Sequence, residues 1–524
     1  MKYIKLVILG LLTFYFYLLI GLLASSNGYK HPEGIFLIEK GLLALKGNPP
    51  RLENTGLIYP PLPFYAIFPF IPFAPLASPF LASSLGMSAF VIFITYRLLK
   101  KQHKPILFVL LFLSLTLNPL LLYAGSSGSS IHLYLTSIVA FYTLIFEYYS
   151  KPISFYLALS GVLLGLIVLI RYEIIFILPT LFFATVLLSI ETTIGREVKF
   201  SEFFKLIKEL PAYRKTFFRK TFAIYLMLFV PPTLAFVSWV YLNWIFTSNP
   251  FNFLESPYAY FRTLKTYALL NPYLLELKSN IFKDFIEVAK NILLLSPMFF
   301  YILFIFRKKP FYTFALLAPA FGLIISSYFG LSMMTIDFFA SFILISFIGL
   351  MYAISEGLVK KHNLAITVYI ILLAFSIYTG FKKLYNSIYP EENLFIKALI
   401  EGKTNETFKE DIECAQFLKQ VAKPDETIII DDSNGYPVVA FYGDPKNFIL
   451  PYQYEFYSVV QTPEVYADYI VVYNPDRFEG ARDIINVKNG NIFHKGKEGL
   501  ELIFSSEKWR VFKSQGKFKI FVKG

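Results

Sequence analysis

Residues 4–33 read IKLVILGLLTFYFYLLIGLLASSNGYKHPE. The run from Ile4 to Ala24 is apolar and long enough to cross a hydrocarbon layer of roughly 30 Å as a helix. It resembles a signal peptide in charge and length, but it lacks an obvious small-residue cleavage site and further apolar segments follow it. We therefore predict a retained membrane helix that leads directly into a polar stretch containing Glu33.

The rest of the chain repeats this apolar pattern. Hydrophobic residues make up 56% of the 524 positions, charged residues 16%, and the mean hydropathy is +0.55, which is too apolar for an ordinary soluble fold. We predict a mainly α, polytopic membrane helix bundle of about eleven transmembrane helices. The expected spans are Ile4–Ala24, Leu81–Leu99, Ile106–Tyr123, Ile131–Tyr148, Ile153–Ile170, Ile174–Ile190, Phe222–Phe246, Ile292–Phe306, Phe311–Phe329, Phe338–Ile354 and Leu364–Tyr378.

The basic residues indicate how the bundle is oriented. The net charge is +13, and the cations cluster at Arg97 to Lys104, at Arg196 to Lys220, at Arg307 to Lys309, and at Lys360 and Lys361. If Lys2 and Lys5 are cytoplasmic, every cluster falls on the cytoplasmic side, as the positive-inside bias requires. We therefore predict a multi-pass protein of the cell membrane with a cytoplasmic N-terminus, an extracytoplasmic C-terminal tail, membrane lipids as partners and no nucleic-acid partner.

Four segments are then expected on the outer face: Ser25–Phe80, Gly125–Ser130, Thr247–Asn291 and everything after Phe381. The first is too long for a simple connector. It contains an apolar stripe at helical spacing, with Glu33 and Lys40 on the other side, which predicts a helix lying at the membrane surface. Many prolines follow between Tyr59 and Pro79, and they indicate a broken, partly re-entrant segment.

The tail differs in composition from the bundle. Charged residues become frequent after about Asn393, and helical and strand periodicities alternate. We predict two domains, a transmembrane domain over residues 1–390 and an extracytoplasmic α/β soluble domain over residues 391–524. The expected elements are a helix at Phe408–Val421 and strands at Thr427–Ile430, Tyr469–Tyr473, Leu500–Phe504, Trp509–Phe512 and Phe518–Val522. The lone Cys414 excludes a disulfide framework and a thiolate metal cluster within this chain.

The order of motifs resembles a known family, the C-type glycosyltransferases, which take a sugar from a polyprenyl-phosphate carrier on the outer or lumenal face. The chain is most similar to the group of dolichyl-phosphate-mannose protein mannosyltransferases and lipid A aminoarabinose transferases. The motifs that carry the resemblance are His31-Pro32-Glu33 followed by Glu39, Gly47, Tyr59-Pro60-Pro61-Leu62, Arg171-Tyr172-Glu173, Asn243-Trp244-Ile245-Phe246, Asn249-Pro250-Phe251 and Ser256-Pro257-Tyr258.

The resemblance implies transfer of a monosaccharide to a lipid, glycan or protein acceptor by inverting displacement. Such a reaction needs one carboxylate to deprotonate the acceptor and cations to stabilise the departing phosphate. We expect Glu33 to be the catalytic base and Arg171, Lys30 and Arg262 to bind the donor phosphate. Further expected substrate contacts are His31, Glu39, Tyr59, Glu173 and Tyr258. No cofactor is required, although Glu33 and Glu39 would have the oxygen ligands to share a divalent cation.

Two positions depart from the family pattern. Glu33-Gly34 stands where the family often has Asp or an Asp-Glu pair, and Asp337 stands where relatives commonly carry a basic residue. Each main assignment also has a structural alternative. Glu33 suits the first turn of a helix after Pro32, and Arg171 suits a snorkelling cation that pairs with Glu173 between two spans.

Three other classes of function remain open at this point. A polytopic transporter or lipid-linked-sugar flippase would also have many spans, but it should show internal repeats and ionisable residues near the bilayer midplane. A non-catalytic membrane scaffold would account for the external domain, but it gives no reason for the long acidic first loop. An oligosaccharide ligase or polymerase is the nearest rival within the enzymes.

Overall fold

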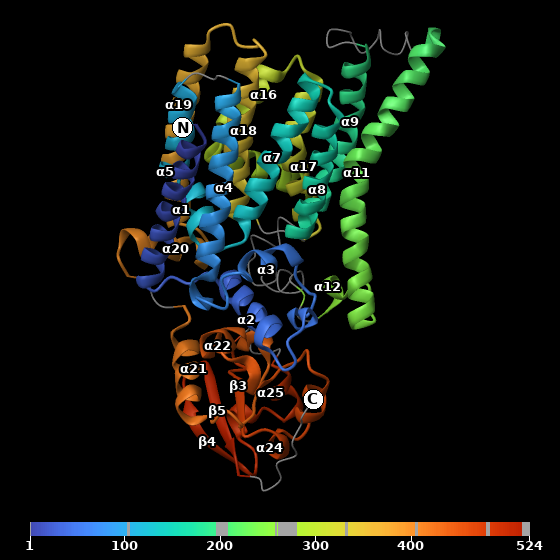
Figure 1. Cartoon of the computed structure of the whole chain (residues 1–524). Helices are drawn as coiled ribbons and strands as arrows, with labels where there is room; N and C mark the ends of the chain where they lie inside the picture. Colours follow the sequence, from blue (N-terminus) through green and yellow to red (C-terminus); the bar gives the residue numbers. More distant parts are fainter. Residues whose placement is uncertain are drawn as a thin grey trace.

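The computed structural model describes residues 2–101, 105–194, 208–256, 259, 280–330, 334–403, 407–477 and 483–515. A bundle of apolar helices forms one end of the molecule, and a small domain built on a β-sheet forms the other (Figure 1). Two helices of the first loop, α2 (Pro32–Lys46) and α3 (Pro61–Ile67), lie in the layer between them. The C-terminal domain therefore reaches the bundle through the segment that carries Glu33.

Within the described residues, seven helices are long and apolar enough to cross a membrane. These are α1 (Lys2–Ser26), α4 (Ser78–Lys100), α7 (Ile131–Ser150), α11 (Pro211–Thr247), α17 (Pro310–Tyr328), α18 (Ile336–Ser355) and α19 (His362–Tyr385). Helix α18 is buried along nearly its whole length and forms the centre of the bundle. Helices α8 (Ser154–Ile170) and α9 (Ile177–Ile194) are shorter but equally apolar.

Two of the predicted spans are broken rather than continuous. Ile106–Tyr123 is divided into α5 (Pro105–Leu117) and α6 (Pro119–Ser126), which meet at 66°. Ile292–Phe306 is divided between α15 (Ile281–Leu295) and α16 (Met298–Phe306), which meet at 102°. Pro119 lies at the first break and Pro297 at the second. Proline has no N–H to continue the helical hydrogen bonds, so each proline favours an interruption of the helix.

Helix α19 supplies polar groups to both breaks. The amide Nδ2 of Asn118 donates to Ser376 Oγ at 3.1 Å, and the Ser376 hydroxyl donates in turn to the carbonyl of Leu295. Thr379 donates to the carbonyl of Leu294 at 2.5 Å. One turn of α19 thus satisfies two backbone carbonyls that the α15–α16 break leaves without helical partners and the side-chain amide of Asn118 at the α5–α6 break, as an apolar surrounding demands.

Helices α8 and α11 approach each other closely at two glycines. A Cβ on Gly161 would lie 2.0 Å from the carbonyl oxygen of Met227, and one on Gly165 would lie 3.2 Å from that of Pro231. Pro231 follows Met227 by four positions and has no N–H, so the Met227 carbonyl cannot receive its usual helical bond. The absence of a side chain at Gly161 lets α8 pack directly against this carbonyl.

The first loop, predicted to be an outer segment, forms helices as expected, but the polar side of its main helix α2 is covered by the C-terminal domain. Helix α2 begins with Pro32 at its first turn and ends at Gly47. Lys40, expected on a polar face, is only 4% exposed, because the C-terminal domain covers that side. The remaining short elements of the loop are η1 (Leu52–Thr55) and η2 (Pro75–Ala77), so the proline-rich stretch is broken as expected.

Three further short helices link the bundle to its surroundings: η3 (Tyr172–Phe176), α12 (Asn252–Glu255) and α20 (Pro390–Ile400). Helix α20 falls inside the predicted soluble domain, 391–524, yet it packs on the bundle. Its Phe395 ring makes edge contacts with Tyr29 and Tyr123, and the Ala398 carbonyl accepts from Asn27. The unit built on the sheet therefore begins later than residue 391, after α20.

The C-terminal domain has a five-stranded sheet in the order β2-β1-β3-β5-β4. Strands β2, β1 and β3 are parallel, whereas β5 pairs antiparallel with β3 and β4. The strands are β1 (Ile428–Ile430), β2 (Phe448–Ile449), β3 (Tyr469–Tyr473), β4 (Leu500–Ser505) and β5 (Trp509–Ser514). The predicted strand at Phe518–Val522 lies outside the described residues, and β2 was not predicted.

Helices cover both faces of this sheet. Alternate strand residues point to opposite sides, so Ile428 and Ile430 join one apolar cluster and Ile429 joins the other. The covering elements are α21 (Lys409–Val421), α22 (Asp432–Tyr442), η4 (Pro445–Asn447), α23 (Tyr454–Val459), α24 (Pro463–Tyr466), α25 (Ile484–Lys488) and α26 (Ile492–Lys495). The domain is thus of the α/β class that the alternating periodicity indicated.

Two acidic residues lie near the ends of β1 and β3, at the edge of the sheet where open α/β sheets commonly bind ligands: Asp431 directly follows β1, and Asp483 bonds to the last residue of β3. Asp431 accepts from the backbone N–H of Ile484 at 2.8 Å, and Asp483 accepts from that of Tyr473 at 2.7 Å. Burial raises the pKa of Asp431 to about 6 and that of Asp483 to about 7. Because their oxygens are engaged by backbone donors, these acids join the loops of the domain together.

Candidate functional site

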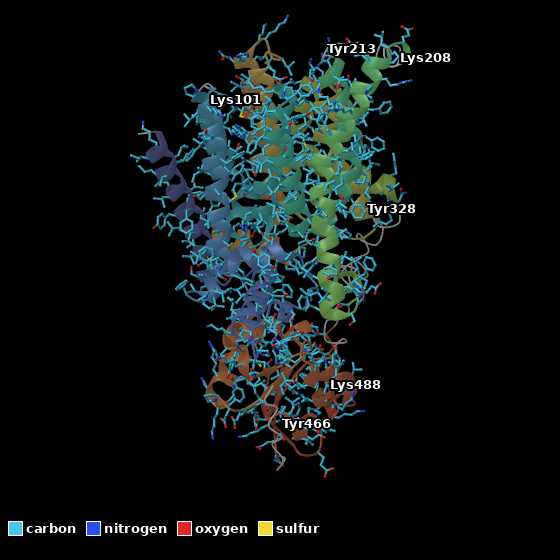
Figure 2. All side chains as sticks on the ribbon, turned by 45° about the vertical axis from the view of Figure 1, so that its right-hand side comes forward. Lys101, Lys208, Tyr213, Tyr328, Tyr466 and Lys488 are labelled. Atoms are coloured by element: carbon cyan, nitrogen blue, oxygen red, sulfur yellow. The ribbon has the colours of Figure 1, made fainter. Side chains whose placement is uncertain are left out.

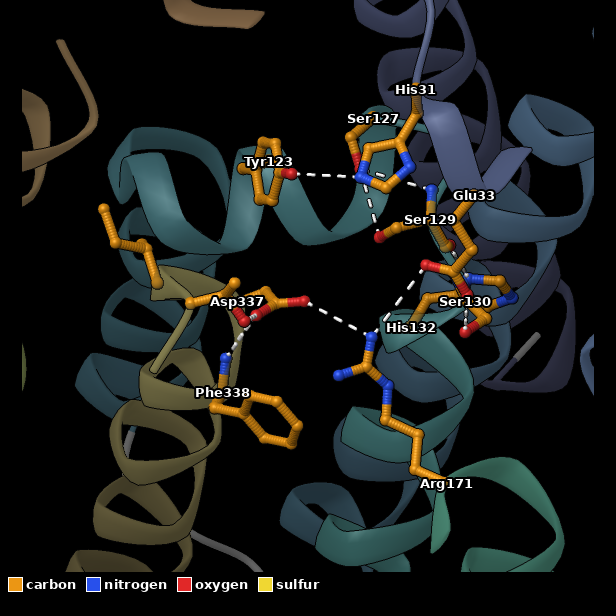
Figure 3. Close-up of polar contacts among 12 residues, drawn as sticks. His31, Glu33, Tyr123, Ser127, Ser129, Ser130, His132, Arg171, Asp337 and Phe338 are labelled. Atoms are coloured by element: carbon orange, nitrogen blue, oxygen red, sulfur yellow. Dashed lines mark hydrogen bonds and ion pairs between the residues drawn. The ribbon is translucent and has the colours of Figure 1, made fainter. Parts of the chain in front are cut away.

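Three charged residues from distant parts of the chain meet where the bundle adjoins the first loop. Glu33 lies in the first turn of α2, Arg171 directly follows α8, and Asp337 lies in the first turn of α18. Figure 3 shows all three side chains directed toward one point, with the turn that contains Ser127, Ser129 and Ser130 beside Glu33. We refer to Glu33, Arg171 and Asp337 as the charge triad.

The carboxylate of Glu33 has two differently engaged oxygens. Oε1 accepts from the hydroxyl of Tyr59 at 2.6 Å and from both the hydroxyl and the backbone N–H of Ser130. Oε2 faces Nη2 of Arg171 at 3.9 Å. This arrangement holds the carboxylate by one oxygen and directs the other toward the cation.

Arg171 lies between two carboxylates and above an aromatic ring. Its Nη2 lies 3.7 Å from Oδ2 of Asp337 and 3.9 Å from Glu33, and its guanidinium carbon lies 4.7 Å from the centre of the Phe338 ring. The next residue, Tyr172, accepts from the indole N–H of Trp239 on α11 at 2.6 Å. The end of α8 thereby contacts three other helices, α2, α11 and α18.

The local electrostatics favour an ionised Glu33. Burial alone would raise the pKa of Glu33, but Arg171, His31 and the hydrogen bonds from Ser130 and Tyr59 outweigh it, and the net shift is downward. Burial lowers the pKa of His31, against the opposing influence of Glu33. His31 is therefore neutral near pH 7, and the charge triad carries one more negative than positive charge.

Aromatic rings and α20 form the wall beside His31. The ring nitrogen Nε2 of His31 lies 3.1 Å from the hydroxyl of Tyr123, and the Tyr123 ring contacts the ring of Phe395. Glu392 of α20 accepts from the backbone N–H of Ile336 at 2.6 Å and from Ser387, so it satisfies the start of α18 next to Asp337. Burial raises the pKa of Glu392 to about 8.

The structure brings four of the predicted site residues together: Glu33, Arg171, Tyr59 and His31. Lys30 instead donates to the carbonyl and hydroxyl of Ser25 at the end of α1. The backbone of Glu173 is part of η3, but its side chain lies outside the described residues. Tyr258 and Arg262 also lie outside the described residues.

Glu39 belongs to a different cluster. It is fully buried and lies 3.2 Å from Lys40, which in turn lies 2.5 Å from Asp432 of the C-terminal domain. Glu33 and Glu39 are separated by about 9 Å along α2, and each faces its own cation. They do not converge to share a divalent cation, and no group of three His, Cys, Asp or Glu side chains in the described part of the chain is arranged to hold a metal ion.

Several residues of the site were not predicted as contacts. Ser130 donates to Glu33 from the Gly125–Ser130 turn, which was predicted as an outer segment, but no pattern singles out one serine among several. Tyr123 and Glu392 lie in segments that only the fold brings near His31 and Asp337. Asp337 departs from the pattern of the family that the sequence resembles, but nothing in the sequence predicts that it lies beside Arg171.

The chain matches no known protein-family model, and no curated protein matches it at a significant level. The charge triad and its surroundings are therefore the basis on which a function is assigned.

Proposed function

We propose that the protein is a membrane glycosyltransferase that moves a monosaccharide from a polyprenyl-phosphate carrier to a lipid, glycan or protein acceptor outside the cytoplasm. The observation that carries the proposal is the pairing of the Glu33 carboxylate, whose side chain is 14% exposed, with the buried Arg171 at the end of an apolar helix bundle. A base and a phosphate-binding cation are the two groups that this transfer needs. In the proposed orientation, both groups face the outer side, where a lipid-borne donor and an acceptor would meet.

In the proposed reaction, the acceptor hydroxyl oxygen attacks the anomeric carbon while the bond from that carbon to the phosphate oxygen breaks. Oε2 of Glu33 takes the proton of the hydroxyl, and the polyprenyl phosphate leaves as an anion beside Arg171. The configuration at the anomeric carbon inverts. The leaving group needs no proton, so a second carboxylic acid is not required.

The distribution of basic residues supports the orientation that this reaction requires. Figure 2 shows Lys101 and Lys208 at the end of the bundle remote from the C-terminal domain, where Lys488 and Tyr466 lie. A cytoplasmic location for the basic end follows the positive-inside bias. If the two bent pairs and the two shorter apolar helices also cross, the bundle has the eleven spans expected from the sequence and the C-terminal domain lies outside.

The test is transfer of radiolabelled sugar from a panel of polyprenyl-phosphate donors in membranes with matched amounts of wild type or Glu33→Gln. Wild type should transfer, and the variant should lose at least about a hundredfold, as expected for a general base. Glu53→Gln is the matched control, because Glu53 lies in the same loop and pairs with Arg51 at the surface. Full activity of Glu33→Gln would place the base elsewhere, and no transfer by wild type would favour a transporter or scaffold.

A further inference from the structure

Helix α2 connects the charge triad to the C-terminal domain. Glu33 lies at its start, and Lys40 lies about two turns later, buried against Asp432 at 2.5 Å. All three side chains of the group Glu39, Lys40 and Asp432 are less than a tenth exposed. Breaking such a buried pair is costly, because it leaves an uncompensated charge in an apolar surrounding.

Apolar packing joins the same two helices. Leu43 of α2 belongs to the apolar core of the C-terminal domain, and Ala440 of α22 belongs to the cluster that α2 forms with α3. The contact between α2 and α22 therefore has a hydrophobic part around its ion pair. The two helices are therefore joined by packed apolar surfaces as well as by the Lys40–Asp432 ion pair.

A second set of contacts runs from α22 to Glu33 through aromatic rings. Tyr436 lies one turn after Asp432 on α22, and its ring contacts Phe36 edge-on with centres 6.0 Å apart. Phe36 contacts Tyr59 in the same manner at 5.7 Å. The Tyr59 hydroxyl then donates to Oε1 of Glu33 at 2.6 Å.

The two sets of contacts converge on one short segment. The ammonium of Lys40 lies 5.7 Å from the centre of the Phe36 ring, so the ion pair and the aromatic contacts share this side chain. Helix α22 thus holds α2 at Lys40 and at Phe36, and the second of these also supports Tyr59. Loss of the contact at Lys40 or at Phe36 would therefore shift Tyr59, whose hydroxyl holds the Glu33 carboxylate.

We propose that helix α22 of the C-terminal domain positions Glu33 for the transfer reaction, and that Asp432 and Tyr436 are positioning residues. This inference rests on the proposed function and deepens it, because it gives the C-terminal domain a defined part in the site. Neither residue touches the substrates. Their influence reaches the reaction through Lys40, Phe36 and Tyr59.

The test uses the full-length protein with Asp432→Asn, Tyr436→Ala and Tyr436→Phe, measured for sugar transfer and for amide hydrogen exchange. Asp432→Asn and Tyr436→Ala should lower kcat about tenfold or more with little change in the donor KM, because the base is misplaced while the donor site is intact. Tyr436→Phe keeps the ring and should retain the wild-type kcat. In both impaired variants, exchange should increase over residues 33–40.

Glu413→Gln is the control, since Glu413 forms an exposed ion pair with Lys409 on α21 of the same domain and should leave both readouts unchanged. Unchanged exchange over residues 33–40 in Asp432→Asn and Tyr436→Ala would overturn the proposal, because α22 would then not order α2. Increased exchange with an unchanged kcat would also overturn it and leave the contact as a simple tether. Failure of the proposed function would be recognised separately, as an absence of transfer by the wild type.

Discussion

Oδ2 of Asp337 lies 3.7 Å from Nη2 of Arg171, the same nitrogen that faces Glu33 at 3.9 Å. The cation assigned to the donor phosphate therefore already has two carboxylates beside it. A phosphate that binds to Arg171 must compete with Asp337 for the guanidinium or remain close to its negative charge. If the proposed donor binds at Arg171, Asp337 is expected to limit its affinity.

Asp337→Asn is expected to lower the donor KM by roughly tenfold, since a like charge about 4 Å away contributes on the order of 1 to 4 kcal/mol. The asparagine keeps an oxygen to accept from the Phe338 N–H and the Thr335 hydroxyl, so the start of α18 should remain in place. Steady-state kinetics with varied donor would measure the effect. Asp425→Asn, at an exposed position, is the charge-matched control. An unchanged or higher KM would show that the phosphate does not bind at Arg171.

The pKa of Glu33 lies below its ordinary value because Arg171 and the hydrogen bonds from Ser130 and Tyr59 outweigh burial, so the proposed base should remain ionised at pH values where an ordinary glutamate begins to be protonated. Activity requires the ionised form and is lost as the pH falls through this pKa. Tyr59→Phe removes a hydrogen bond to the ionised form, and the acid limb of kcat/KM should therefore move to higher pH. Tyr65→Phe, on helix α3 shortly after Tyr59 but half exposed, should leave the limb in place. Coincident acid limbs for Tyr59→Phe and wild type would contradict the assignment of Glu33 as base.

Burial raises the pKa of Glu39 to about 8. The unfolded chain releases this proton near pH 4.3, whereas the folded chain retains it to about pH 8. The folded state thus binds more protons across this window, and its stability relative to the unfolded state falls as the pH rises through it. Glu39→Gln has no proton to lose in this window, so its stability does not fall for this reason as the pH rises. The midpoint of thermal unfolding of the variant in detergent should therefore rise relative to that of wild type between pH 5 and pH 8. A difference independent of pH would show that Glu39 is ionised throughout.

The approach of α8 to α11 depends on Gly161. Gly161→Ala would place a methyl group 2.0 Å from the Met227 carbonyl oxygen, so the two helices must separate. We expect a loss of at least about 2 kcal/mol in the free energy of unfolding. Gly165→Ala, where the nearest atom is 3.2 Å away, should cost less, and Val162→Ala on the exposed side should cost little. Equal stability of Gly161→Ala and Val162→Ala would show that the helices do not pack in this way.

Much of the architecture follows from local patterns in the sequence. The length of the apolar runs identifies the helices. A run such as Ile4 to Ala24 belongs in an apolar surrounding, where the backbone must satisfy its own hydrogen bonds and therefore forms a helix. The breaks at Asn118 and Ser296 were missed, since hydropathy sums over a window and does not distinguish a bent pair of helices from a straight one. The prolines after each break were visible, but proline is also tolerated within membrane helices, as Pro231 and Pro232 of α11 show.

The candidate site was predictable only in part. Glu33 and Arg171 stand out because charges interrupt apolar sequence, and that signal needs no knowledge of the fold. Their partners come from positions far along the chain, so no local pattern connects Arg171 with Asp337. Lys40 was expected on an open polar face because the periodicity of α2 cannot reveal that Asp432, 392 residues later, covers it.

The hydrogen bonds at the broken helices can form only late in the synthesis of the chain. The chain is synthesised from its N-terminus, and the amide of Asn118 finds its partner Ser376 only after 258 further residues have been made. Until α19 packs on the bundle, Asn118 and the carbonyls of Leu294 and Leu295 lack the hydroxyls that satisfy them in the finished fold. Helix α19 therefore completes the polar contacts of helices made much earlier, and a chain that ends before residue 376 would leave the Asn118 amide and the Leu295 carbonyl without these partners.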